Sequence, residues 1–326
     1  MSNGGVFDGE HNHEIYFPSE ITRRALLAGA ISGLGATFLG LGESSALATV
    51  AKPLLPGFDA FAKSLYVSVQ GKYFLVETNG VPNHNMMVGI TNWQQQIPVP
   101  QDYSGKNAWK IPKSPVVAKT PISAKDNLFR GAIALAVNGV PIFNALNNRG
   151  EVSKDIGELD NWGGHCGRAD DYHYHAAPLH LSAIVGAKKP IAYALDGFPI
   201  YGAKEPDGSP MQPLDELNGH FDAKNKYHYH GTNTYPFING GMKGVVKVVG
   251  GQIDPQPATH PFRPDGQPLA GAAITDFSHK KDESYVLKYS VNGAKFEIDY
   301  SITGPVVNMT FINSSGTQAT QSYIRN

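Results

Sequence analysis

The chain contains a single cysteine, Cys166, among its 326 residues. One cysteine cannot form an intrachain disulfide, and a zinc site built from thiolates needs more than one. The chain also lacks a basic excess, because 27 Lys and Arg stand against 28 Asp and Glu, for a formal net charge of -1. Nucleic acids and anionic membrane surfaces attract basic proteins, so neither is an expected partner.

The common local signatures of catalysis are also missing. The sequence has no G-x-S-x-G, no P-loop, no G-x-G-x-x-G between a strand and a helix, and no C-x-x-C-H for a covalent haem. A Ser-His-Asp triad stays open, since triads leave no local spacing signal. Helix is scarce as well, and the best helical candidate is residues 179–186. With 36 Gly and 23 Pro, the composition predicts a mainly β fold with long loops.

The N-terminal segment has the pattern of an export signal. Arg23 and Arg24 precede a mildly apolar run, which ends in Ala46-Leu47-Ala48. This pattern predicts a twin-arginine leader over residues 1–48, which the export machinery recognises and which is then removed. The run is rich in Gly and Ala, so it is a poor permanent membrane anchor. We therefore expect a periplasmic or secreted protein; the alternative is a cytoplasmic protein with a helical N-terminal segment.

The remainder reads as strands and turns. Two strands are expected around Gly71, and residues 92–130 are expected to be loop with an edge strand. Residues 252–276 form a Pro-rich connection, and residues 283–326 alternate like a small antiparallel β module. Between these parts, we expect one domain over residues 65–276.

That domain contains an internal repeat. Asn138-Gly139 in "LAVNGVPIF" is matched by Asp196-Gly197 in "YALDGFPIY", a spacing of 58 residues (138 to 196). Farther along, Gly164-His165 is matched by Gly219-His220, a spacing of 55 residues (165 to 220). We predict that residues 131–175 and 189–230 are duplicated modules that pack as a pseudo-symmetric pair. The Asn-Gly and Asp-Gly pairs read mainly as turns.

Each repeat ends in the same histidine pattern, His-x7-His-x-His within Tyr-His-Tyr-His. Side chains alternate faces along a strand, so His173 and His175 point to one side and the tyrosines to the other. His165 lies in a loop from which it can reach them. The second repeat offers His220, His228 and His230 in the same way.

Three imidazoles with an open position are typical of a catalytic metal site. Zinc and copper both suit imidazole ligands, so a zinc hydrolase and a copper oxidoreductase are both allowed. Two alternatives remain: the six histidines hold two metals in one shared cleft, or they only pack and form hydrogen bonds.

Several nearby residues are candidates for supporting roles. A histidine that binds a metal usually donates its other N–H to a carboxylate or carbonyl, so Asp160 and Asp215 can support the ligands. The alternative for both is a turn role. His84 and His180 lie outside the repeat, and either can complete a site. Cys166 is a ligand in one repeat only or, more simply, a buried inert thiol.

Several segments together resemble the YHYH-domain family. They are "ETNGVPNH", "LAVNGVPIFNA", "GGHCGRADDYHYHAAP", "YALDGFPIYG", "LDELNGHFDAKNKYHYHGTNTYPFINGGMKG" and "PFRPDGQPLAGAAITDF", which cover roughly residues 75–276. The resemblance implies an exported bacterial protein in which the histidine motifs matter, and it supplies no reaction. We expect an exported metal-binding protein, either a metalloenzyme or a non-catalytic metal-binding or storage module. A structural or interaction protein is the third possibility, and the small-molecule substrate stays open.

Overall fold

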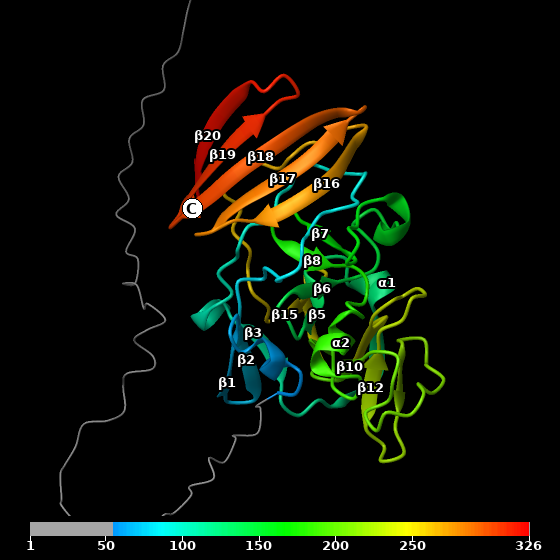
Figure 1. Ribbon diagram of the computed structural model, residues 1–326. Helices are drawn as coiled ribbons and strands as arrows, with labels where there is room; N and C mark the ends of the chain where they lie inside the picture. The colour runs from blue at the N-terminus through cyan, green and yellow to red at the C-terminus, as the bar shows by residue number, and fades with distance from the viewer. Residues whose placement is uncertain (1–54, 326) are drawn as a thin grey trace, which may run out of the picture. The chain divides into compact units, whose positions relative to one another are not determined.

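Five β-sheets make up most of the regular structure between residues 55 and 325, which are the residues that this computed structural model describes (Figure 1). The described helices are short: α1 (Ala124–Asn127), α2 (Leu181–Val185) and three 3-10 turns. The prediction of a mainly β fold is confirmed, and α2 falls within the predicted helical segment. No helix in this part of the chain is long and apolar enough to cross a bilayer. The predicted leader, residues 1–48, lies outside the described residues.

The largest sheet has eight strands in the order β11-β12-β10-β9-β5-β6-β8-β7. Its strands are β5 (Ala132–Ala136), β6 (Pro141–Phe143), β7 (Gly164–Cys166), β8 (Tyr172–Tyr174), β9 (Ala192–Ala194), β10 (Pro199–Tyr201), β11 (Gly219–Phe221) and β12 (Tyr227–His230).

The two halves of this sheet use the same pairings. Strand β5 pairs with β9 at the centre, and each then forms an antiparallel hairpin, with β6 or β10. The next pairing is parallel, β6 with β8 and β10 with β12. The last is antiparallel, β8 with β7 and β12 with β11. Both Tyr-His-Tyr-His motifs therefore lie one strand in from an edge of the sheet.

Matching turns connect the two central hairpins. Gly139 and Gly197 have φ angles of 86° and 96°, in the left-handed region that favours glycine. A side chain at either position would also collide, with Thr78 in one turn and with the Pro112 carbonyl in the other. The predicted Asn-Gly and Asp-Gly turns are thus confirmed. They hold strands β5 and β9, whose residues are all buried, in antiparallel hairpins.

Three smaller sheets accompany the eight-stranded sheet. Strands β1 (Tyr66–Gln70) and β2 (Tyr73–Glu77) form the predicted pair around Gly71, and β3 (Trp109–Pro112) extends it. Strand β4 (Val117–Ser123) pairs with β13 (Gly241–Gly244), and β14 (Lys247–Val249) pairs with β15 (Gln252–Asp254). The segment 92–130 thus holds two strands, rather than the one expected.

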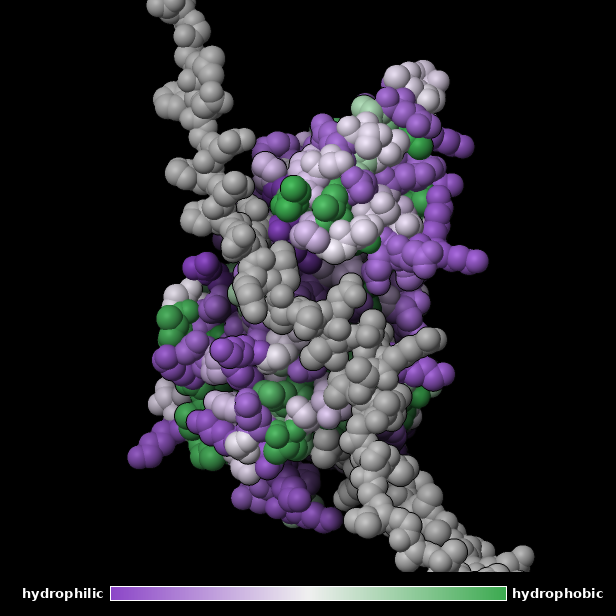
Figure 2. All heavy atoms as spheres, turned by 90° about the vertical axis from the view of Figure 1, so that its left-hand side faces the viewer, coloured by the Kyte–Doolittle hydropathy of each residue, from purple (hydrophilic) through white to green (hydrophobic). Residues whose placement is uncertain are grey.

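The C-terminal sheet is an antiparallel meander of five strands. These are β16 (Ala272–His279), β17 (Ser284–Val291), β18 (Ala294–Thr303), β19 (Val306–Ile312) and β20 (Gln318–Ile324). It begins at Ala272, so its first strand uses residues expected to be connection. The Tyr300 hydroxyl donates to the Pro98 carbonyl at 2.6 Å, and the N–H of Ile274 donates to the Ile90 carbonyl at 2.9 Å. Where described residues are visible in Figure 2, apolar side chains are scattered among polar ones.

Candidate metal centres

The first histidine cluster consists of His165, His173 and His175. His165 lies on β7 opposite His173 on β8, and His175 follows β8 directly. The Nε2 atom of His175 lies 3.0 Å from Nε2 of His165 and 3.1 Å from Nε2 of His173. His173 and His175 are almost fully buried, with exposed fractions of 2% and 5%. The alternation of the strand therefore brings the three rings together on one face.

Hydrogen bonds at the other ring nitrogens fix the protons of two of these rings. Nδ1 of His173 donates to the Asp171 carbonyl at 2.9 Å, and Nδ1 of His175 donates to the Asn144 carbonyl at 2.5 Å. A carbonyl only accepts, so Nδ1 carries the proton and Nε2 of each neutral ring keeps a lone pair. His165 can donate one hydrogen bond at most, which leaves lone pairs facing each other. A metal ion at their meeting point satisfies all three.

Protonation of an imidazole could also separate these lone pairs, but the buried site disfavours it. Burial, together with the neighbouring His173, lowers the pKa of His175 to about 3. Burial also holds the pKa of His165 well below its usual value. His165 and His175 are thus neutral near pH 7, which is the form of imidazole that binds a metal.

The second cluster consists of His220, His228, His230 and Glu205. The Glu205 carboxylate touches all three rings: Oε2 lies 2.9 Å from Nε2 of His228, and Oε1 lies 3.1 Å from Nε2 of His220 and 3.5 Å from Nε2 of His230. Nδ1 of His230 donates to the Gly202 carbonyl at 2.7 Å. These four side chains are close enough to hold one metal ion, as are the three of the first cluster.

Electrostatics favour an ionised Glu205 beside neutral His228 and His230 in the second cluster. Burial opposes ionisation of Glu205, but the Gln212 N–H and His228 hold the pKa of this carboxyl below its usual value. Burial lowers the pKa of both His228 and His230, and Glu205 only partly opposes this effect. Three imidazoles and one carboxylate make a complete tetrahedral ligand set for zinc.

The loops that lead to the two clusters match, and they differ at one decisive position. The N–H of Asn147 donates to the Glu151 carbonyl, and the N–H of Glu205, 58 residues further on (147 to 205), donates to the Ser209 carbonyl. The carbonyls of both residues accept from a glycine three positions later. Asn147 thus stands where Glu205 stands in the second half. Its amide nitrogen donates to the carboxylates of Glu151 and Glu158, at 3.0 and 3.4 Å.

A cavity of about 210 Å³ opens beside the first cluster, and its lining includes all three histidines. Phe143 also lines it and stacks on His173 with ring centroids 4.0 Å apart. The buried carboxylate of Glu158 faces the cavity and is paired with Arg149 at 2.7 Å. The first cluster is therefore open to a small molecule on one side.

The two aspartates of the repeat lie on the tyrosine side of the strands. Oδ2 of Asp160 accepts from the Tyr172 hydroxyl at 2.7 Å, while Oδ1 accepts from the Gly164 N–H at 3.0 Å. Asp215 makes the equivalent contacts, with the Tyr227 hydroxyl at 2.9 Å and a turn N–H. Both carboxylates thus hold a turn and a tyrosine, rather than a histidine of the clusters.

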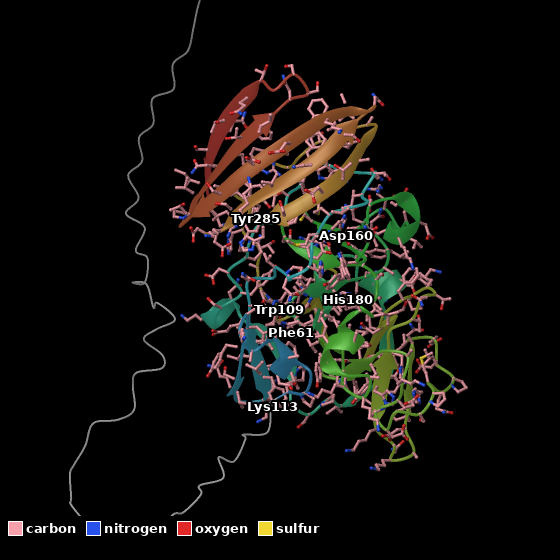
Figure 3. The ribbon with its side chains drawn as sticks, in the orientation of Figure 1. Phe61, Trp109, Lys113, Asp160, His180 and Tyr285 are labelled. Atoms are coloured by element: carbon pink, nitrogen blue, oxygen red, sulfur yellow. The ribbon has the colours of Figure 1, made fainter. Side chains whose placement is uncertain are left out.

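His84 and His180 lie on that side as well, away from both clusters. His84 stacks on Trp162, and its Nε2 accepts from the Tyr174 hydroxyl at 2.7 Å. His180, which is labelled in Figure 3, meets the His84 ring edge-on, with centroids 5.3 Å apart. Burial lowers the pKa of each to about 4. Neither residue completes a cluster.

Cys166 is 1% exposed, and its thiol contacts the Met87 sulfur at 3.5 Å. Burial holds the pKa of the thiol well above its usual value. A protonated thiol is a poor metal ligand, so these features fit the inert role.

A comparison with known families covers the first cluster. Residues 108–212 match the model of a family described as YHYH protein. The match supports the predicted resemblance over a shorter range than expected, and it includes Glu205 but ends before His220. No curated protein and no solved structure matches the chain.

Proposed function

We propose that this protein is an exported metal-binding protein with two unlike transition-metal centres. The observation that carries the proposal is the convergence of Nε2 lone pairs at the first cluster, where His173 and His175 both use Nδ1 as a hydrogen-bond donor. Neutral imidazoles arranged in this way repel one another unless a cation lies between them. Imidazole suits zinc and copper, and either ion fits a set of three histidines.

The first centre is the candidate for catalysis. Three protein ligands leave a coordination position free, and the cavity of about 210 Å³ gives a small molecule access to it. A metal there supplies a Lewis acid that can activate bound water or, in the case of copper, a redox couple. Glu158 lies buried in the same cavity, where its carboxylate pairs with Arg149 at 2.7 Å.

The second centre is the candidate for a resident ion without catalytic function. Glu205 contributes the fourth ligand, and closed four-ligand sites are typical of structural metals. A protein that only stores or retains metal is therefore the second candidate, and the ligand set of Glu205 is what favours it.

The matched strand pairings support an origin of the eight-stranded sheet by internal duplication. The carbonyls that orient His175 and His230 belong to Asn144 and Gly202, 58 residues apart (144 to 202). We infer that one ancestral centre became two and that the fourth ligand then differed between them.

Elemental analysis of the untagged chain, after incubation with zinc or copper and removal of free metal, tests the proposal. We expect two equivalents of metal in the wild type and one equivalent in either double variant, His173→Ala/His175→Ala or His228→Ala/His230→Ala. His260→Ala serves as the control, because His260 is exposed and outside both clusters. The proposal fails if reconstituted wild type holds no transition metal, or if both double variants keep wild-type occupancy.

Export has a test of its own. We expect the protein recovered from the producing bacterium to begin near Thr49 and to lie outside the cytoplasm. Replacement of Arg23 and Arg24 by lysine should hold the chain in the cytoplasm at full length. Cytoplasmic wild type with an intact N-terminus would contradict the predicted leader.

A further inference from the structure

We propose that the first centre binds a small carboxylic acid, whose carboxylate occupies the place that Glu205 fills in the second centre. The proposal rests on the proposed function, because a bound metal is the anchor. The second centre is a template for the ligand that completes the first.

The first step is the equivalence of the two scaffolds. His165 pairs with His173, and His220 with His228, at the same register of matching hairpins. On the second scaffold, a carboxylate reaches all three Nε2 atoms, at 2.9, 3.1 and 3.5 Å. A group of this size and charge therefore fits the space that three such histidines enclose.

The second step is the missing ligand. The place of Glu205 is taken by Asn147, whose Oδ1 accepts from the Arg149 N–H at 2.9 Å while its amide nitrogen faces Glu151 and Glu158. No carboxylate belongs to the first metal-binding group among the described residues. The loop therefore has the same backbone conformation as in the second half, but it provides no carboxylate ligand.

The third step is charge. Neutral imidazoles do not offset the charge of a divalent ion, and the first centre is mostly buried. Glu205 lowers the net charge of the second centre by one. Glu158 cannot do the same for the first, because Arg149 already pairs with it at 2.7 Å. The Asp171 carboxylate lies 3.6 Å from Nδ1 of His173, on the opposite side of that ring from Nε2. An anionic ligand from solution therefore supplies the negative charge where the three Nε2 atoms meet.

The fourth step is size and lining. The cavity of about 210 Å³ is below the range of roughly 300–1,000 Å³ that is usual for drug-sized ligands, so the acid must be short. The Phe143 ring forms an apolar wall of the cavity, which Gln94 and Gln96 also line. These features favour a short organic acid over an inorganic anion.

The test uses the full mature chain loaded with cobalt(II), whose visible absorption reports its coordination. Acetate is the probe, and chloride at equal ionic strength is the control for anions in general. We expect acetate to change the spectrum of wild type in a saturable way, at one of two cobalt ions. Chloride should reproduce little of this change.

Two variants exchange the decisive residue. Asn147→Glu should remove the acetate response, since the chain then supplies the carboxylate itself. Glu205→Asn should open the second centre and raise the response from one cobalt ion to two. Gln318→Glu is the control: it adds the same charge at an exposed position on β20, outside the cavity, and it should keep the wild-type response.

The outcomes separate this inference from the proposed function. Absence of cobalt from the histidine clusters refutes both. Cobalt at both centres with no acetate response in wild type refutes the inference alone, as does an equal response to chloride. If Asn147→Glu does not fold, Glu205→Asn decides, and an unchanged single response in that variant overturns the template argument.

Discussion

The acid sensitivity of the metal-free protein follows from the buried rings of the first cluster. Burial lowers the pKa of His175 from an ordinary 6.5 to about 3. Below about pH 6.5 the unfolded chain therefore takes up a proton at this residue that the folded chain does not. The free energy of unfolding consequently falls as the pH falls, until the folded pKa is reached near pH 3.

The size of the effect can be worked out for a single histidine. Consider a histidine that stays neutral in the folded protein and titrates normally in the unfolded chain. Between about pH 7 and pH 5, such a histidine lowers the free energy of unfolding by roughly 2 kcal/mol. His175→Gln removes that titration. It also relieves His165 of a neighbour that lowers its pKa. From pH 7 to pH 5, the free energy of unfolding should therefore fall further in wild type than in the variant, by at least ~2 kcal/mol.

Urea denaturation at several pH values, with a chelator present, measures this difference directly. The comparison concerns the change with pH, so any general destabilisation by the substitution cancels. His260→Gln is the control and should follow wild type, because His260 is exposed. Parallel pH profiles for wild type and His175→Gln would refute the conclusion that this ring stays neutral in the folded protein.

Three further predictions concern stability. Tyr172→Phe removes a hydroxyl that donates to buried Asp160, and the free energy of unfolding in urea should fall by about 1–3 kcal/mol; a smaller loss would mean that other donors satisfy the carboxylate. Arg263→Met leaves Asp170, which is 2% exposed, without its bidentate partner, and should cost ~3–5 kcal/mol in the same assay. Zinc at about 100 times its dissociation constant should stabilise wild type by about 2.7 kcal/mol for each centre, and no shift of the melting temperature would contradict metal binding to the folded state.

The face of each histidine was predictable because it depends only on the strand period. In "YHYH" at residues 172–175, the tyrosines are buried on one side and the imidazoles meet on the other. The central hairpins were predictable for a similar reason, since Asn138-Gly139 and Asp196-Gly197 require a local conformation that few other pairs adopt. Local rules of this kind do not depend on the remainder of the fold.

Glu205 was missed because its role depends on contacts between distant segments. It lies in a loop before β11, and its counterpart Asn147 carries no charge, so the repeat gave no sign of a ligand there. The available signal was the difference between the two copies: an uncharged residue, Asn147, occupies the position that the acidic Glu205 occupies in the other copy. Asp160 shows the opposite case. Its spacing from His165 along the sequence allowed a supporting contact with that histidine. In the structure, however, the Tyr172 hydroxyl and the turn amides hold the Asp160 carboxylate on the other side of the strand.

The boundary of the C-terminal sheet was misjudged for a physical reason as well. Strand β16 begins within a stretch that contains many prolines and shows little alternation by itself. Its register includes an irregularity between Ile274 and Asp276, which interrupts the two-residue period. Pairing with β17 defines this strand, and a single segment of sequence does not reveal its partner.

The alternation in β8 and β12 has a consequence for how the chain reaches its correct pairing. A slip of either strand by one residue would turn the phenols toward the centre and the imidazoles into the core. Tyr172 would then lose Asp160, and the three Nε2 atoms would no longer meet. If the clusters bind metal as proposed, only a chain that has paired these strands in the correct register can hold it. Metal binding then stabilises the correctly paired sheet over sheets whose strands have slipped by one residue.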